Sequence, residues 1–323
     1  MIERILPGLY RIEVPLPHNP LRAVNSYVIR SRDRNLIIDT GFNLRECIDA
    51  MMSGLNGLGV DLGRTDFFIT HMHADHLDLV SSLATNSSVV CLNRLDVEFV
   101  KSRGQWENRM YDSAQSAGFP ENELQEVIET YSGRDYGKWG FQDFTPLGDD
   151  DAISIDEFQF RCVETPGHSK GHMCLYESEK RILISGDHIL GQISPNISLW
   201  NYDWNPLDEY LRSLDKVNKL DVKLVLPGHR DHFRNCSARI QELKDHHEVR
   251  AKEVLSVLKR GSMDAFQTAS LMTWDMKFGS WDLVPSQQKL FATTEALSHL
   301  KYLEERGLVR KEMDGQKMIF SIS

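Results

Sequence analysis

Short hydrophobic runs separated by polar turns dominate the first 230 positions of the chain. Residues 9–14 alternate apolar and polar side chains, and apolar runs follow at 25–30 and 35–39, which predicts a β-meander. Similar runs predict further strands at residues 66–70, 88–92, 152–155, 158–163, 173–176, 181–185 and 223–226.

Apolar residues at helical spacing follow several of these strands. We expect a helix that begins after Asn43, as its N-cap, and ends near residue 58, and a second helix at 76–84. The same spacing predicts helices at residues 206–220, 236–260, 263–273 and 285–306. Groups of strands with helices after each group predict a layered α/β protein without a regular β-α-β alternation.

Metal-ligating side chains gather directly after the predicted strand at 66–70. Residues 70–76 read Thr-His-Met-His-Ala-Asp-His. Because alternate residues of an extended chain point the same way, His71 and His73 can reach one point, while Asp75 and His76 face a second. Imidazole and carboxylate groups are typical ligands of zinc and similar divalent metals. The alternatives are a loop of solvated histidines and a closed structural zinc site, which would normally use cysteine.

Three later predicted strands also end close to a histidine or an aspartate, namely His168, Asp187 and His229. Pro-Gly precedes both of these histidines, which fixes each turn and lets the backbone come close. Because strand ends lie side by side along one edge of a sheet, we expect the four loops to form one site. Asp39 also ends a strand, and turn chemistry is its expected role rather than catalysis.

With these motifs in this order, residues 8–232 resemble the metallo-β-lactamase superfamily, and in particular its glyoxalase II and ribonuclease Z branch. The resemblance implies a four-layer αββα sandwich that holds two metals. The implied ligands are His71, His73 and His168 for the first metal, Asp75, His76 and His229 for the second, and Asp187 as a bridge between both. The drug-hydrolysing enzymes of the zinc-cysteine type have a cysteine in place of Asp187, so antibiotic hydrolysis is not expected.

The implied chemistry is hydrolysis by a hydroxide that bridges the two metals. Water shared by two dications loses a proton near neutral pH, and Asp75 is expected to orient it and accept its proton, while Asp187 helps hold the metals together. Zinc is the expected metal, although iron and manganese suit the same donors. Our leading hypothesis is that the protein hydrolyses a small ester or thioester that carries an acyl group. The alternatives are an RNA or DNA phosphodiesterase and a ligand-sensing regulator that binds nucleic acid. A single-iron oxygen-using enzyme is disfavoured because every second-metal residue is present.

The composition agrees with a globular enzyme of the cytoplasm. Of the 323 residues, 41% are hydrophobic and 26% are charged, and the net charge of −10 opposes broad binding to nucleic acid. Apolar runs of about 18 residues and a secretion signal are both lacking, so we expect neither membrane insertion nor export. The five cysteines are scattered, which is typical of a reducing compartment.

The C-terminal region resembles a winged-helix appendage. The helices expected at 236–260, 263–273 and 285–306 precede a predicted hairpin around Asp314-Gly315, so we expect a catalytic domain at 1–235 and a winged-helix domain at 236–323. Residues 237–323 hold 13 Lys or Arg and 12 Asp or Glu, a balance that favours packing, pocket-shaping or homodimerisation over nucleic-acid binding.

A helical insertion is expected at about 93–148. It is rich in aromatic residues, among them Trp106, Tyr131, Tyr136 and Trp139. Two interpretations stay open for it, a lid over the site or a small satellite core. His172 and His188 lie beside expected ligands in the sequence, and a hydrogen-bonded structural role is favoured for both.

Overall fold

The computed structural model describes residues 1–102, 106–130, 144–275 and 278–323. The chain divides into two compact units. The first contains Met1–Lys101, Asp135–Pro195 and Ser213–Ile240, and the second contains Ser102–Arg134, Asn196–Arg212 and Gln241–Ser323. The units therefore do not coincide with a single cut of the chain at residue 235, because two earlier segments pack with the C-terminal helices.

The first unit contains a seven-stranded sheet in the order β1 to β7. Its first four strands pair antiparallel, as a meander does, and β4 to β7 pair parallel. The strands are β1 (Ile2–Leu6), β2 (Leu9–Pro15), β3 (Ala23–Ile29), β4 (Asn35–Ile38), β5 (Thr65–Phe68), β6 (Val90–Asn93) and β7 (Phe144–Leu147). The carboxyl ends of β4, β5 and β6 consequently lie at one edge of the sheet.

A five-stranded sheet completes the first unit, in the order β12-β11-β10-β9-β8. Its strands pair antiparallel except for β11 and β12, which are parallel. They are β8 (Ala152–Ile155), β9 (Phe158–Glu164), β10 (Met173–Glu177), β11 (Ile182–Gly186) and β12 (Leu224–Pro227). All seven of the strand runs predicted after the meander are present, within a few residues of the expected bounds.

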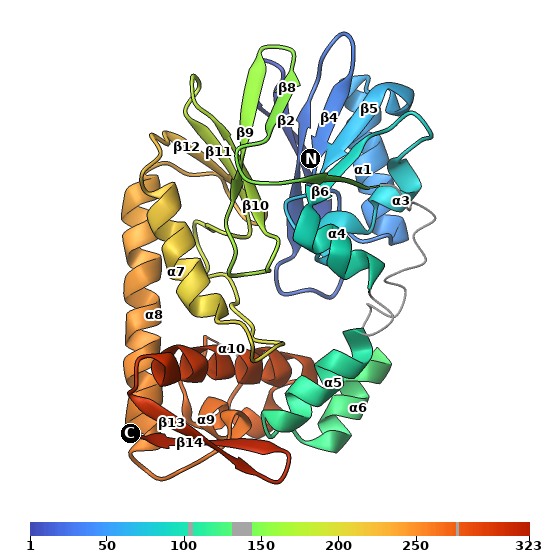
Figure 1. Cartoon of the computed structure of the whole chain (residues 1–323). Coiled ribbons are helices and arrows are strands. Elements are labelled where there is room, and N and C mark those ends of the chain that lie inside the picture. The colour runs from blue at the N-terminus through green and yellow to red at the C-terminus, as the bar shows by residue number, and fades with distance from the viewer. Residues whose placement is uncertain (103–105, 131–143, 276–277) are drawn as a thin grey trace. The chain divides into compact units, whose positions relative to one another are not determined.

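Both sheets contribute to one hydrophobic core, so they face each other (Figure 1). Tyr27, Phe68 and Leu9 of the larger sheet are buried with Phe160 and Leu175 of the smaller one. The opposite face of the larger sheet packs against α1 (Arg45–Leu58), which buries an apolar stripe on it. Burial of alternate strand residues on two faces explains why the predicted α/β sandwich forms.

Two of the predicted helix boundaries were wrong. Leu44, not Asn43, precedes the first turn of α1, and the side chain of Asn43 instead bonds Ser81 and Ser82. The helix expected at 76–84 is two short helices, α2 (Ala74–Leu77) and α3 (Val80–Leu83).

The predicted insertion at 93–148 contains a strand besides its helices. It begins with α4 (Arg94–Lys101), and it ends with β7, which pairs parallel with β6 as an edge strand. Pro146 lies in β7. Proline lacks an N–H group and occurs in sheets mainly at edge strands, so its presence made a strand at this position hard to predict from the sequence. Tyr131, Tyr136 and Trp139 lie outside the described residues.

The second unit is mostly helical. Its elements are α5 (Trp106–Ser116), α6 (Glu121–Thr130), α9 (Ala265–Leu271), the 3-10 turn η4 (Trp281–Leu283), α10 (Ser286–Glu305), β13 (Val309–Asp314) and β14 (Lys317–Ile322). Two further helices, α7 (Pro206–Val217) and α8 (Cys236–Leu258), contribute residues to both units. Three helices followed by a hairpin match the order expected of a winged helix, and that assignment stays a prediction. Among the described residues, none of the helices is long and apolar enough to span a membrane.

Helices α5 and α6 pack into the second unit. Met110, Phe119, Leu124 and Val127 form a buried cluster with Leu290 of α10. This packing supports the satellite-core interpretation for the described part of the insertion. It also explains why 102–134 joins the C-terminal helices in one compact unit.

Candidate metal centre

The structure brings all seven predicted ligands together in the first unit, at the edge where several strands end. His71 and His73 follow β5, and Asp75 and His76 lie in the short helix α2. His168 follows β9, Asp187 follows β11 and His229 follows β12. Both sheets therefore supply side chains to one site, which requires the sandwich to be closed.

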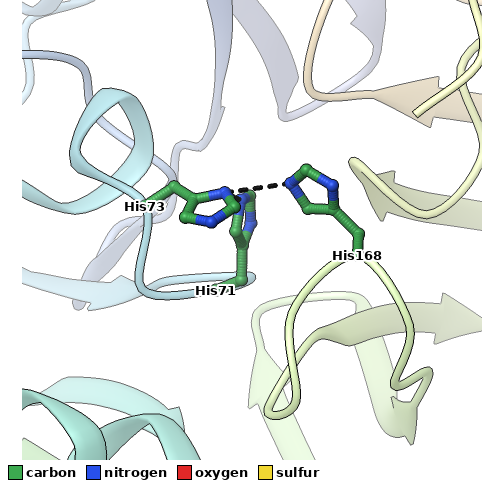
Figure 2. Close-up of side chains that lie close together, drawn as sticks. All are labelled: His71, His73 and His168. Atoms are coloured by element: carbon green, nitrogen blue, oxygen red, sulfur yellow. Dashed lines mark hydrogen bonds between the residues drawn. The ribbon is translucent and has the colours of Figure 1, made fainter. Parts of the chain in front are cut away.

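Three imidazoles form the first cluster (Figure 2). Nδ1 of His73 lies 2.9 Å from Nε2 of His71 and 2.9 Å from Nε2 of His168. Each of these two short contacts can hold only one hydrogen. At least one of the three nitrogens therefore presents a lone pair to the space between the rings, where a cation could bind. The alternation of His71 and His73 along the chain produces the predicted convergence, and the second sheet adds His168.

A second cluster contains Asp75, His76 and His229, and Asp187 lies against both clusters. Nε2 of His229 lies 3.4 Å from Oδ2 of Asp75 and 3.3 Å from Oδ2 of Asp187. The other oxygen of Asp187 lies 3.6 Å from Nε2 of His76. Oδ2 of Asp187 is also 3.7 Å from Nε2 of His168 in the first cluster. This carboxylate therefore has the position that a group shared by two cations needs.

Unpartnered buried atoms test whether this site suits a cation. Nε2 of His76, Nε2 of His229 and Oδ1 of Asp187 have no hydrogen-bond partner among the described residues. The Nδ1 of His76 bonds Asp39 and that of His229 bonds the carbonyl of Ala23, so each ring in its neutral form, the form that binds metals, directs the lone pair of Nε2 inward. Buried polar atoms are seldom left unpaired. A divalent cation would satisfy all three atoms, and the residues present fit it.

The charges of the two clusters differ. Burial and the neighbouring histidines lower the pKa of His71 well below its ordinary value, and that of His73 to about 3. These rings are neutral at pH 7, the form that binds metals. Burial alone would lower the pKa of His229, but the carboxylates of Asp187 and Asp75 raise it to about 10. The second cluster thus attracts positive charge.

Asp39 is a supporting residue whose contacts the sequence did not reveal. Its carboxylate accepts hydrogen bonds from the backbone N–H and the hydroxyl of Thr70 and from Nδ1 of His76, each at 2.8 Å. The residue directly follows β4 and has a φ of 58°, so the expected turn role is present as well. It lies beside the 70–76 loop because β4 and β5 are parallel neighbours, a pairing that turn chemistry alone does not predict.

His172 and Asn25 support the other loops. Nε2 of His172 accepts the backbone N–H of Asp187 at 3.1 Å, and its Nδ1 bonds the hydroxyl of Thr165 at 2.7 Å. His172 therefore has a hydrogen-bonded role, directly behind an expected ligand. The amide of Asn25 donates to the carbonyls of Pro227 and Arg230 at 2.9 and 2.7 Å, which holds the loop that carries His229.

The Pro-Gly turn before His229 allows the close approach that we expected of it. A Cβ on Gly228 would lie 2.5 Å from Oδ1 of Asp187 and 2.8 Å from Cε1 of His76. Only a glycine leaves room for both groups at this point.

A family model and several known proteins are similar to this chain over most of its length. Residues 19–229 match a family model described as the metallo-beta-lactamase superfamily. "Probable metallo-hydrolase YqjP" of Bacillus subtilis (strain 168) is 24% identical over 326 residues, which cover 96% of each chain. "Atrochrysone carboxyl ACP thioesterase" of Emericella nidulans is 23% identical over 271 residues, 84% of this chain and 71% of the relative.

Solved structures extend the similarity over the full length. The crystal structure of the metallo-beta-lactamase family protein TTHA1429 from Thermus thermophilus has 28% sequence identity and a TM-score of 0.83. The match covers 99% of this chain and 100% of that one. The fold, the matched residues and the His/Asp clusters together establish that this chain is a hydrolase of the metallo-β-lactamase superfamily.

Proposed function

We propose that this protein hydrolyses a small ester or thioester with an acyl group, using two divalent cations held by the seven side chains described above. The observation that carries the proposal is the convergence of metal-ligating side chains from four separate loops, with unpartnered buried atoms on His76, Asp187 and His229. His71, His73 and His168 would hold one cation. Asp75, His76 and His229 would hold the other, and Asp187 would contact both.

The chemistry needs no serine or cysteine nucleophile. Two bound cations would supply a polarised substrate oxygen and an acidified water, and zinc is the expected metal although iron or manganese suits the donors. Burial alone would raise the pKa of Asp75, but His76 and His229 lower it to about 2, so this carboxylate is ionised at neutral pH. An ionised Asp75 can orient the attacking water and accept its proton.

An acyl substrate is favoured over nucleic acid. The relative from Emericella nidulans bears the name of a carboxyl ACP thioesterase, and thioesterases act on acyl groups. The net charge of −10 works against binding to phosphates. The choice of substrate depends on residues outside the ligand loops, so a panel of acyl-thioesters and esters is needed to identify the acyl group.

We expect the C-terminal helices to have a packing role rather than to read nucleic acid. In a winged helix, the helix before the hairpin would enter the groove, and here that helix is α10. Thirteen of its 20 residues are buried. Within the second unit its Glu304 and Glu305 accept hydrogen bonds from Tyr202 and Asn205, each at 2.6 Å. The burial of most of this helix supports a packing role over contact with bases.

The test is turnover by the metal-free and reloaded protein. Chelated protein should lose hydrolysis of acyl-thioesters and esters, and zinc, iron or manganese should restore it. Asp75→Asn should lower kcat by about 10²- to 10⁴-fold. Asp66→Asn is the matched control, because Asp66 pairs with Arg34 away from the site.

Two outcomes would contradict the proposal. Full activity of the metal-free protein would exclude a metal-dependent reaction. Cleavage of single-stranded RNA that is abolished by Asp75→Asn, with no acyl substrate turned over, would favour the phosphodiesterase alternative instead.

A further inference from the structure

A buried aspartate outside the seven expected ligands lies between two of the ligand loops. Asp96 is 2% exposed and lies in the first turn of α4, which begins directly after β6. Since β6 is the parallel neighbour of β5, the start of α4 lies at the sheet edge where the 70–76 loop begins.

The carboxylate of Asp96 bonds both loops that hold the first histidine cluster. Its Oδ2 accepts the backbone N–H of Met72 at 2.9 Å, and Met72 lies between His71 and His73. The carboxyl group of Asp96 also accepts the backbone N–H of Gly171, which lies three residues after His168. These two donors come from loops that follow strands of different sheets.

The fit between Asp96 and the second loop is close. A Cβ on Gly171 would lie 2.3 Å from Oδ1 of Asp96 and 2.8 Å from its backbone nitrogen. Glycine at this position is therefore what allows the 166–171 loop to reach the carboxylate. The approach leaves no room for an intervening water.

We propose that Asp96 is a positioning residue that connects the two loops and so sets the distance between His168 and the His71–His73 pair. The inference rests on the proposed function, because it assigns Asp96 to the cation held by these three histidines. Oδ2 accepts the N–H of Met72 and Oδ1 lies against Gly171, so each oxygen of the carboxyl group faces one of the two loops. The histidines need a fixed spacing to share a cation, and groups that orient ligands in this way affect affinity strongly.

Asp96→Asn tests the connection. Asparagine has one acceptor oxygen, and its amide nitrogen would face the second N–H donor to donor, so one loop would be released. Titration of the chelated protein with zinc against a competing chromophoric chelator should show two sites in the wild type. In the variant, one site should be weaker by about 10- to 100-fold and the other unchanged.

Asp264→Asn is the matched control. Asp264 is also buried, and its carboxylate accepts the backbone N–H of Gln267 at 2.8 Å in the second unit, where it caps α9. Both zinc sites should keep their affinity in this variant. Weakening of both sites alike in Asp96→Asn, or two unchanged sites, would overturn the inference while the proposed function stands. A wild-type protein that binds no zinc would overturn the proposed function and this inference with it.

A measurement on the wild type does not depend on how the variant folds. In the chelated protein, the amides of Met72 and Gly171 should exchange hydrogen slowly although both lie in loops, because each donates to a buried carboxylate. Exchange at the rate of exposed loop amides would contradict a connection that exists before the metal binds.

Discussion

Asp39→Asn should remove one cation from the site and leave the fold in place. Asparagine tolerates the left-handed backbone of this position, where φ is 58°. Its oxygen can still accept the N–H of Thr70. Its amide nitrogen, however, would donate to Nδ1 of His76, where the wild-type carboxylate accepts a hydrogen. The proton of His76 would therefore move to Nε2, which is the nitrogen that the cation needs.

The size of the effect follows from that hydrogen bond. Binding the cation would return the proton of His76 to Nδ1 and leave two buried donors facing each other. An unpaired buried donor and the loss of a charge-assisted bond together amount to roughly 2–4 kcal/mol, which is about 30- to 700-fold in affinity. Burial alone would lower the pKa of His76, and Asp39 is the leading cause that raises it, so the variant also makes the ring a weaker base.

Zinc titration of the chelated variant against a chromophoric chelator measures this loss. One tight site should remain, held by His71, His73 and His168, and kcat should fall with the second cation. Asp66→Asn serves as the control, since Asp66 lies in β5 and bonds Arg34 and Val89 rather than the site. Two zinc ions bound with wild-type affinity by Asp39→Asn would refute the tautomer argument.

Three further results are expected. In Gly228→Ala, the added Cβ should displace Asp187 and His76 and lower kcat/KM by about 100-fold. The far-UV circular dichroism spectrum should stay unchanged. A fully active variant would show that the close approach of residue 228 to these two side chains is dispensable. Burial raises the pKa of Glu295 to about 7 from an ordinary 4.5, so the folded protein binds this proton more tightly and loses stability as the pH rises from 4.5 to 7. Glu295→Gln should therefore stabilise the second unit by up to about 3 kcal/mol at pH 8 and by nothing at pH 4.5. Tryptophan fluorescence during urea unfolding measures this gain, since five of the six tryptophans belong to this unit. An equal gain at both pH values would contradict the raised pKa of Glu295. Chelation should lower the midpoint of unfolding of the first unit alone, and equal shifts in both units would argue against a site confined to the first.

The sequence alone was sufficient to predict which side chains gather at the site. Each loop that carries an expected ligand follows a hydrophobic run, and both signals are local: the run predicts the strand, and the residue types in the loop after it suggest the ligands. The spacing of His71 and His73 needs nothing beyond the geometry of an extended chain. The seven side chains consequently converge in the structure as expected.

Tertiary structure decided the features that depend on distant contacts. Asp39 and Asp96 carry ordinary turn and helix signals, and their bonds to the ligand loops exist only because parallel strands bring their ends to one edge. The strand β7 is an edge strand that contains a proline, and α5 and α6 pack with α10 rather than with the sheet they follow. Hydrophobic periodicity shows which face of an element is buried, whereas the partner that covers that face is set by long-range packing, which leaves no periodic trace in the chain.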